Sequence, residues 1–111
     1  MTGRRTRAAR PDAGTWSRLR SYTDVLYEEM DKLSKKAPSS RLSDLATQRV
    51  NRAIHEAKEL MAVHDPYIAD LVQFVPAGDN PEVRDAVLVL GEIKAALERL
   101  NSTFELEEEP L

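Results

Sequence analysis

The sequence feature that most restricts the fold is a stripe of apolar side chains toward the carboxyl end of the chain. Its members recur every three or four residues: Val83, Ala86, Val87, Leu90, Ile93, Leu97, Leu100 and Phe104. This interval places them on one face of an α-helix, which has ~3.6 residues per turn. Asn80 and Pro81 precede the stripe and are typical of a helix start, so the pattern predicts a helix from about residue 81 to residue 101.

Two neighbouring residues and one glycine modify this helix. Leu88 and Val89 widen the apolar stripe, which indicates a central helix that is contacted on more than one side. Gly91 lies in the helix interior, where glycine costs about 1 kcal/mol relative to alanine. Close approach of a neighbouring helix would explain a glycine at that position.

Two more long helices are expected in the first half of the chain. Residues 16–36 repeat apolar side chains at the same interval, with Thr15 as the expected cap. Pro38 ends this helix, because the residue before a proline avoids the helical region. The turn that follows holds Ser39 and Ser40, either of which can cap a second helix with a stripe of the same spacing.

A short third helix is predicted over residues 66–75, PYIADLVQFV, with Asp65 as its cap and Pro66 at its first position. It would be apolar on nearly all sides, and such a helix must be covered on all sides. Either the three long helices clamp it, or a partner protein or second copy covers it. The residues expected at such an interface are Tyr67, Ile68, Leu71, Val72, Phe74, Val75 and Val89.

The predicted fold is all-α: an antiparallel helical bundle of three long helices and one short helix, with disordered charged termini. The spacing also suits coiled-coil-like packing, within the chain or between two chains. We expect a basic arm over residues 1–14, the bundle domain over residues 15–104 and an acidic tail over residues 105–111. Nothing in the chain repeats at the period of a solenoid.

Composition excludes several classes of protein. The chain has 111 residues, which suits one domain, and no cysteine, which excludes disulfides and thiolate metal sites. No apolar run approaches the ~20 residues of a membrane helix, and no apolar stretch follows the basic start to form a secretory signal. These features predict a cytoplasmic protein that contacts no membrane.

The two histidines do not form a recognisable site. His55 begins the run HEAKE, in which Glu59 stands where a zinc protease would have its second histidine. On a straight helix His64 lies on the apolar stripe and His55 nearly opposite it, so they cannot share a metal. We expect His55 and Glu59 to form a solvated pair, and His64 to lie at a helix end with Asp65 as its partner. No catalytic residue, metal or cofactor is predicted.

The leading functional prediction is a non-enzymatic module for protein–protein interaction, such as a small subunit or adaptor, with self-association into a homodimer as one form. The first alternative is a nucleic-acid-contacting subunit of a larger complex. It rests on the arginines of the first ten residues, which include no acid: Arg4, Arg5, Arg7 and Arg10. Against it, the chain has a net charge of -3 and a pI of ≈ 5.4.

A second alternative is a ribonuclease. Arg49 and His55 resemble the pattern of the HEPN ribonucleases, which are helical bundles with an arginine a few residues before a histidine on a late helix. That resemblance implies an RNA-cleaving site at those two residues.

Overall fold

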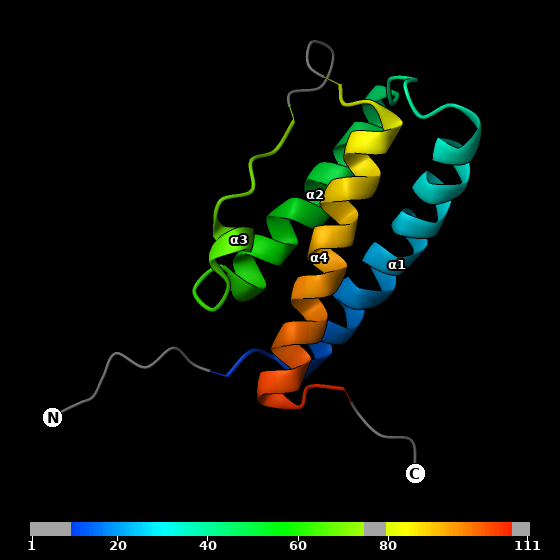
Figure 1. The fold of residues 1–111 in the computed structure, drawn as a ribbon. Coiled ribbons are helices and arrows are strands. Elements are labelled where there is room, and N and C mark those ends of the chain that lie inside the picture. The colour runs from blue at the N-terminus through cyan, green and yellow to red at the C-terminus, as the bar shows by residue number, and fades with distance from the viewer. Residues whose placement is uncertain (1–9, 75–79, 108–111) are drawn as a thin grey trace, which may run out of the picture.

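The computed structural model describes residues 10–74 and 80–107, and this part of the chain forms a bundle of α-helices (Figure 1). The helices are α1 (Ala13–Lys36), α2 (Asp44–Met61), α3 (Pro66–Ala69) and α4 (Val83–Phe104). The predicted all-α fold of three long helices and one short helix is therefore confirmed.

The first helix begins earlier than the apolar stripe predicts. The cap is Asp12 and not Thr15, because the Asp12 carboxylate accepts hydrogen bonds from the backbone N–H and the hydroxyl of Thr15, at 2.8 Å and 2.9 Å. These hydrogen bonds hold the pKa of Asp12 below its usual value. Sequence alone could not rank the two side chains, since aspartate and threonine are both good caps.

The second and fourth helices begin side by side. Arg41 and Glu82 form an isolated antiparallel bridge, and the Leu42 N–H donates to the Pro81 carbonyl at 2.9 Å. This pairing holds the backbone before α2 in a non-helical form, so the cap is Ser43 and not Ser39 or Ser40.

The start of α4 also differs from the prediction. Asn80 donates to the Leu42 carbonyl at 2.9 Å and does not cap the helix. Instead, Glu82 and Asp85 form a capping box, in which each side chain accepts a hydrogen bond from the backbone of the other residue.

The helix directions follow from this shared start. The Trp16 indole near the beginning of α1 donates to the Leu97 carbonyl in the second half of α4, at 3.0 Å, so these two helices are antiparallel. α1 is also antiparallel to α2, whereas α2 and α4 run parallel (Figure 1). The chain between the end of α2 and the start of α4 therefore runs back along the length of the bundle.

The third helix is shorter than predicted. It ends at Ala69, and residues 71–74 are not helical. Two side chains of α2 bind this stretch of backbone: Lys58 donates to the Leu71 carbonyl, and Asn51 bonds to both backbone groups of Phe74. We call residues 70–74 the tethered segment. The prediction of a helix over residues 66–75 is thus wrong beyond Ala69.

The core lies where the three long helices meet, and it consists mostly of the predicted stripes. Its largest fully buried side chains include Trp16, Leu19, Ile54, Met61, Ile68, Leu90, Ile93, Leu97 and Leu106. Leu33 of α1 and Leu45 of α2 also recur at the helical spacing and were expected in the core, but both side chains are exposed. None of the described helices is both long enough and apolar enough to cross a membrane.

The glycine in α4 does face a neighbouring helix, as expected, but the approach leaves room for a methyl group. A Cβ built on Gly91 would lie 3.6 Å from Tyr27 Cε1, an ordinary van der Waals distance. We therefore expect Gly91→Ala to raise the free energy of unfolding by about 1 kcal/mol, because alanine favours the helix interior over glycine. Urea denaturation followed by Trp16 fluorescence measures this change.

Gly14→Ala is the control for that substitution. A Cβ there would lie 3.3 Å from the Asp12 carboxylate that caps α1, so we expect a smaller gain. Equal or lower stability of Gly91→Ala than of the natural chain would show that the Tyr27 ring cannot accept the methyl group.

Candidate functional site

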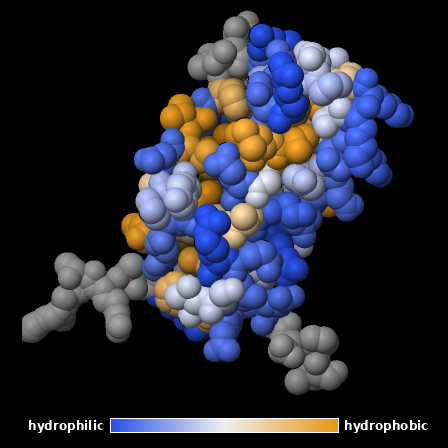
Figure 2. All heavy atoms as spheres, viewed as in Figure 1, coloured by the Kyte–Doolittle hydropathy of each residue, from blue (hydrophilic) through white to orange (hydrophobic). Residues whose placement is uncertain are grey.

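The predicted interface residues separate into surface and core. Val72 is 78% exposed and Tyr67 is 70% exposed, whereas Leu71, Phe74 and Val89 are half-buried against the core. Together these five residues are called the partner face. Figure 2 shows apolar surface gathered along the tethered segment and the adjoining part of α2 and α4.

Two of the predicted interface residues are not part of the partner face. Ile68 is fully buried and belongs to the core, because the single turn of α3 points it inward. It is therefore not available to a partner. Val75 lies outside the described residues.

The backbone beneath the partner face is fixed by polar side chains of α2. The Asn51 amide donates to the Phe74 carbonyl at 2.6 Å and accepts from the Phe74 N–H at 2.7 Å, as a neighbouring strand would. Lys58 Nζ donates to the Leu71 carbonyl at 2.6 Å. Asn51 is only 8% exposed, so its hydrogen bonds are largely shielded from water.

An ion pair holds the connection at its other end. Asp65 Oδ1 accepts the N–H groups of Tyr67 and Ile68 and so caps α3. Asp65 Oδ2 accepts from Arg99 of α4, at 3.2 Å from Nε and 2.8 Å from one terminal nitrogen. The Arg99 guanidinium also lies over the Tyr67 ring, 5.8 Å from its centroid. α3 is thus attached to α4 by charge and by ring contact.

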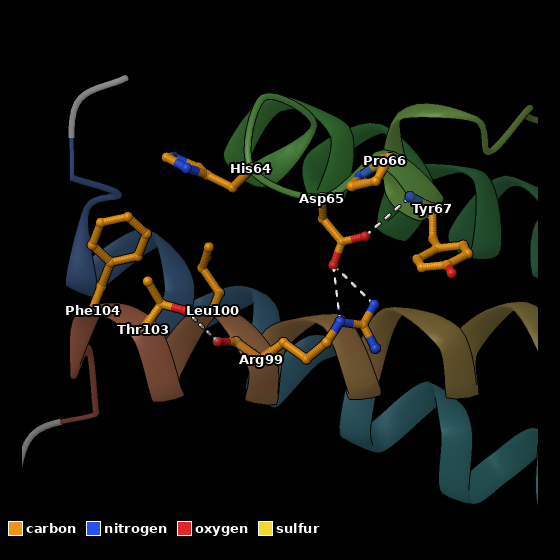
Figure 3. Close-up of a pocket in the computed structure, with 8 residues that line it drawn as sticks. All are labelled: His64, Asp65, Pro66, Tyr67, Arg99, Leu100, Thr103 and Phe104. Carbon is orange, nitrogen blue, oxygen red and sulfur yellow. Dashed lines mark hydrogen bonds and ion pairs between the residues drawn. The ribbon is translucent and has the colours of Figure 1, made fainter. Parts of the chain in front are cut away.

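A pocket of ≈ 320 Å³ lies between the end of α2, the start of α3 and the last turns of α4 (Figure 3). We call it the end pocket. The residues that line it are His64, Asp65, Pro66, Tyr67, Arg99, Leu100, Thr103 and Phe104. In Figure 3 the residues of the α2–α3 turn face the side chains of α4 across this space.

His64 lies at one end of this pocket. Its ring meets the Phe104 ring edge to face, with centroids 5.0 Å apart and an interplanar angle of 69°. The hydrogen bonds described for Asp65 go to α3 and to Arg99 and not to His64. The expected His64–Asp65 pair is therefore replaced by an aromatic contact.

His55 lies on a different surface. Its Nε2 is 3.6 Å from Glu59 Oε1, and both side chains are largely exposed, as predicted. Arg49 and His55 line separate hollows of the surface, the first beside Tyr22 and the second beside Lys58. Across residues 10–74 and 80–107, no group of three or more histidines and carboxylates is placed to hold a metal ion.

The two charged ends of the bundle meet. Arg4, Arg5 and Arg7 lie outside the described residues, but Arg10 donates to the Glu105 carbonyl at 3.2 Å. Arg20 lies 2.8 Å from a Glu107 oxygen, and this hydrogen bond raises the pKa of Arg20.

Residues 105–107, assigned to the acidic tail, close the base of the bundle. Leu106 is buried, and the Asn101 side chain accepts hydrogen bonds from the N–H groups of Leu106 and Glu107, each at 2.7 Å.

Sequence reasoning missed the polar residues that build this region, namely Asn51, Lys58 and Arg99. Asn51 gave a usable signal, because it follows Val50 on the inner half of α2 and a buried amide must find a hydrogen-bond partner. Arg99 gave none, since arginine is ordinary on a helix surface. Comparisons with protein-family models, with curated proteins and with solved structures found no match to this chain.

Proposed function

We propose that this chain is a non-enzymatic interaction module that binds another protein, or a second copy of itself, through the partner face. The observation that carries the proposal is the tethered segment. Its exposed side chain Val72 is apolar, and the backbone on either side of it is bonded to α2, at Leu71 by Lys58 and at Phe74 by Asn51.

A fixed backbone favours binding because its ordering does not have to occur during association. Single exposed apolar residues are common on soluble proteins and need no explanation. Here the exposed Val72 lies in the same short segment as Leu71 and Phe74, which are each half-buried, so a partner could extend an apolar contact that already reaches the core. Figure 2 shows how this apolar area continues toward α4.

The charged groups near this region act in structure. Asp65 accepts hydrogen bonds from Arg99 and from the backbone of α3, and Lys58 donates to the backbone of the tethered segment. His55 and His64 line different hollows, so they do not form a paired acid and base. This arrangement supports a binding role in preference to catalysis.

The proposal is tested by placing a charge on the partner face. We expect Val72→Asp to weaken association at least tenfold, because an unpaired carboxylate buried in an apolar contact is strongly unfavourable. Leu71 and Phe74 are less suitable for substitution, since each also packs against the core. Val25→Asp is the matched control, because Val25 is a 64% exposed valine of α1.

Two measurements are needed, one for self-association and one for a different partner. Sedimentation velocity of the purified chain over a concentration series reports dimers. A photoreactive amino acid at position 72, compared with the same residue at position 25, reports contacts inside the cells that produce the protein. Association or adducts that are indifferent to Val72→Asp, or that are equal from both positions, would contradict the proposal.

A further inference from the structure

We infer that residues 105–107, here called the strap, are a conformational switch that is released from the base of the bundle by extension of α4. The strap turns away from the axis of α4 directly after the helix ends at Phe104 (Figure 1). Its middle residue, Leu106, is 2% exposed and belongs to the core. The strap exchanges between this docked form and a minor form in which the helix continues and Leu106 leaves the core.

The residues at which α4 ends do not favour a helix end. The turn is made by Glu105, whose φ of 53° and ψ of 59° lie in the left-handed region. Across residues 10–74 and 80–107 this is the one positive φ. That conformation is costly for a residue with a side chain and is usually taken by glycine. Glutamate and leucine instead favour a helix, so the local sequence prefers the form that the docked strap interrupts. Conflicts of this kind occur at segments that switch between conformations.

The backbone N–H groups of the strap have a partner in both forms. In the docked form the Asn101 side chain accepts hydrogen bonds from the N–H groups of Leu106 and Glu107, each at 2.7 Å. Their acceptors in a continued helix would be the carbonyls of Ser102 and Thr103, which bond to no residue that the structure describes. The first N–H group of the strap already makes its helical bond, to the Asn101 carbonyl. Extension therefore leaves none of these three groups without an acceptor.

The docked form is held by contacts with distant parts of the chain. Burial of Leu106 is the largest of them, because its side chain returns to water on release. Arg20 of α1 lies 2.8 Å from a Glu107 oxygen, and Arg10 donates to the Glu105 carbonyl at 3.2 Å. Extension would also place both carboxylates at the negative end of the helix dipole. These contacts and charges make the extended form the minor one.

The switch acts on the basic arm through Arg10, the last arginine of that arm. The carbonyl that Arg10 binds would point along the axis of α4 in a continued helix and would no longer face it. Arg20 would lose the carboxylate of Glu107 in the same step. Release of the strap thus frees two arginines at the start of the bundle together.

Relaxation-dispersion NMR of the full chain tests this inference, because it detects minor forms that exchange in microseconds to milliseconds. We expect exchange at the amides of Leu106 and Glu107, with a minor form populated on the order of 1%. The Cα chemical shifts of these two residues in the minor form should lie in the helical range. Shifts typical of an unfolded chain would indicate fraying and would contradict the inference.

Substitutions of Glu105 change the balance between the two forms. Glu105→Gly removes the cost of the left-handed conformation and disfavours the helix, so the minor population should fall at least about fivefold. Glu105→Gln is the matched control, since the Glu105 side chain makes no hydrogen bond or ion pair within the described chain. Its minor population should stay within about twofold of the natural one, because glutamine favours a helix as glutamate does.

Substitutions of the docking contacts should have the opposite effect. Leu106→Ala removes the anchor and keeps a good helix former, so the extended form should become the major one. Arg10→Gln should raise the minor population about twofold or more, because the charged hydrogen bond is lost. Equal populations in Glu105→Gly and Glu105→Gln, or a strap that stays docked in Leu106→Ala, would overturn the inference. Leu106→Ala also decides the matter if the natural chain shows no exchange.

Discussion

Trp16→Ala is expected to lower the free energy of unfolding by about 3–5 kcal/mol, the largest effect among the substitutions considered. The indole is 1% exposed and packs in the core between α1 and α4. Truncation leaves a cavity in addition to losing the apolar contact. A domain of this size has a total stability of roughly 5–15 kcal/mol, so this one change removes a large part of it.

Trp16 is the only tryptophan of the chain, so variants at this position lack the fluorescence signal. Their unfolding must be followed by far-ultraviolet circular dichroism. Trp16→Phe keeps most of the ring but removes the hydrogen bond to the Leu97 carbonyl, and should cost about 1–2 kcal/mol. Val25→Ala alters an exposed side chain of the same helix and should stay within about 0.5 kcal/mol of the natural chain. A loss below about 1 kcal/mol for Trp16→Ala would contradict the packing described.

Asp65→Ala is expected to lower the free energy of unfolding by about 2–3 kcal/mol. The substitution removes the cap of α3, which accounts for about 1 kcal/mol. It also removes the ion pair with Arg99, whose contribution is moderated because the guanidinium is half exposed and regains water. Trp16 fluorescence during urea denaturation measures the change.

Asp70→Ala is the matched control, since no hydrogen bond or ion pair of the Asp70 side chain is seen within the described chain, and its backbone N–H is unaffected. It should change stability by less than about 0.5 kcal/mol. Asp65→Asn keeps a capping oxygen but loses the charge, and should lie between the two. If Asp65→Ala proved as stable as Asp70→Ala, neither the cap nor the ion pair would contribute measurably.

The long helices were predictable because each carries its own signal. The spacing of apolar residues from Val83 to Phe104 is enough to predict the buried face of α4. The buried faces of α1 and α2 are predicted in the same way. The caps were less predictable, since several good capping residues lie close together at each start. Asp12 and Ser43 prevail because of local hydrogen bonds and of pairing between residues far apart in the sequence.

The tethered segment and the end pocket were not predictable for a different reason. The run PYIADLVQFV is as apolar as a buried helix. Its backbone is instead hydrogen-bonded by the side chains of Lys58 and Asn51, which lie 13 and 23 residues earlier in the sequence than their partners. Asp65 and Arg99 are 34 residues apart, and only the parallel course of α2 and α4 brings them together. The spacing of apolar residues predicts which face of a helix is buried. It does not predict which polar side chains, distant in the sequence, come into contact.

The parallel arrangement of α2 and α4 also determines the order in which the chain can assemble. α1 and α2 are neighbours in sequence and can pair through a short turn, whereas the contact between Trp16 and Leu97 closes a loop of 81 residues. Loop closure costs conformational entropy that is recovered only when the distant surfaces pack. We therefore expect a hairpin of α1 and α2 to form the template, and the docking of α4 upon it to limit the rate of folding.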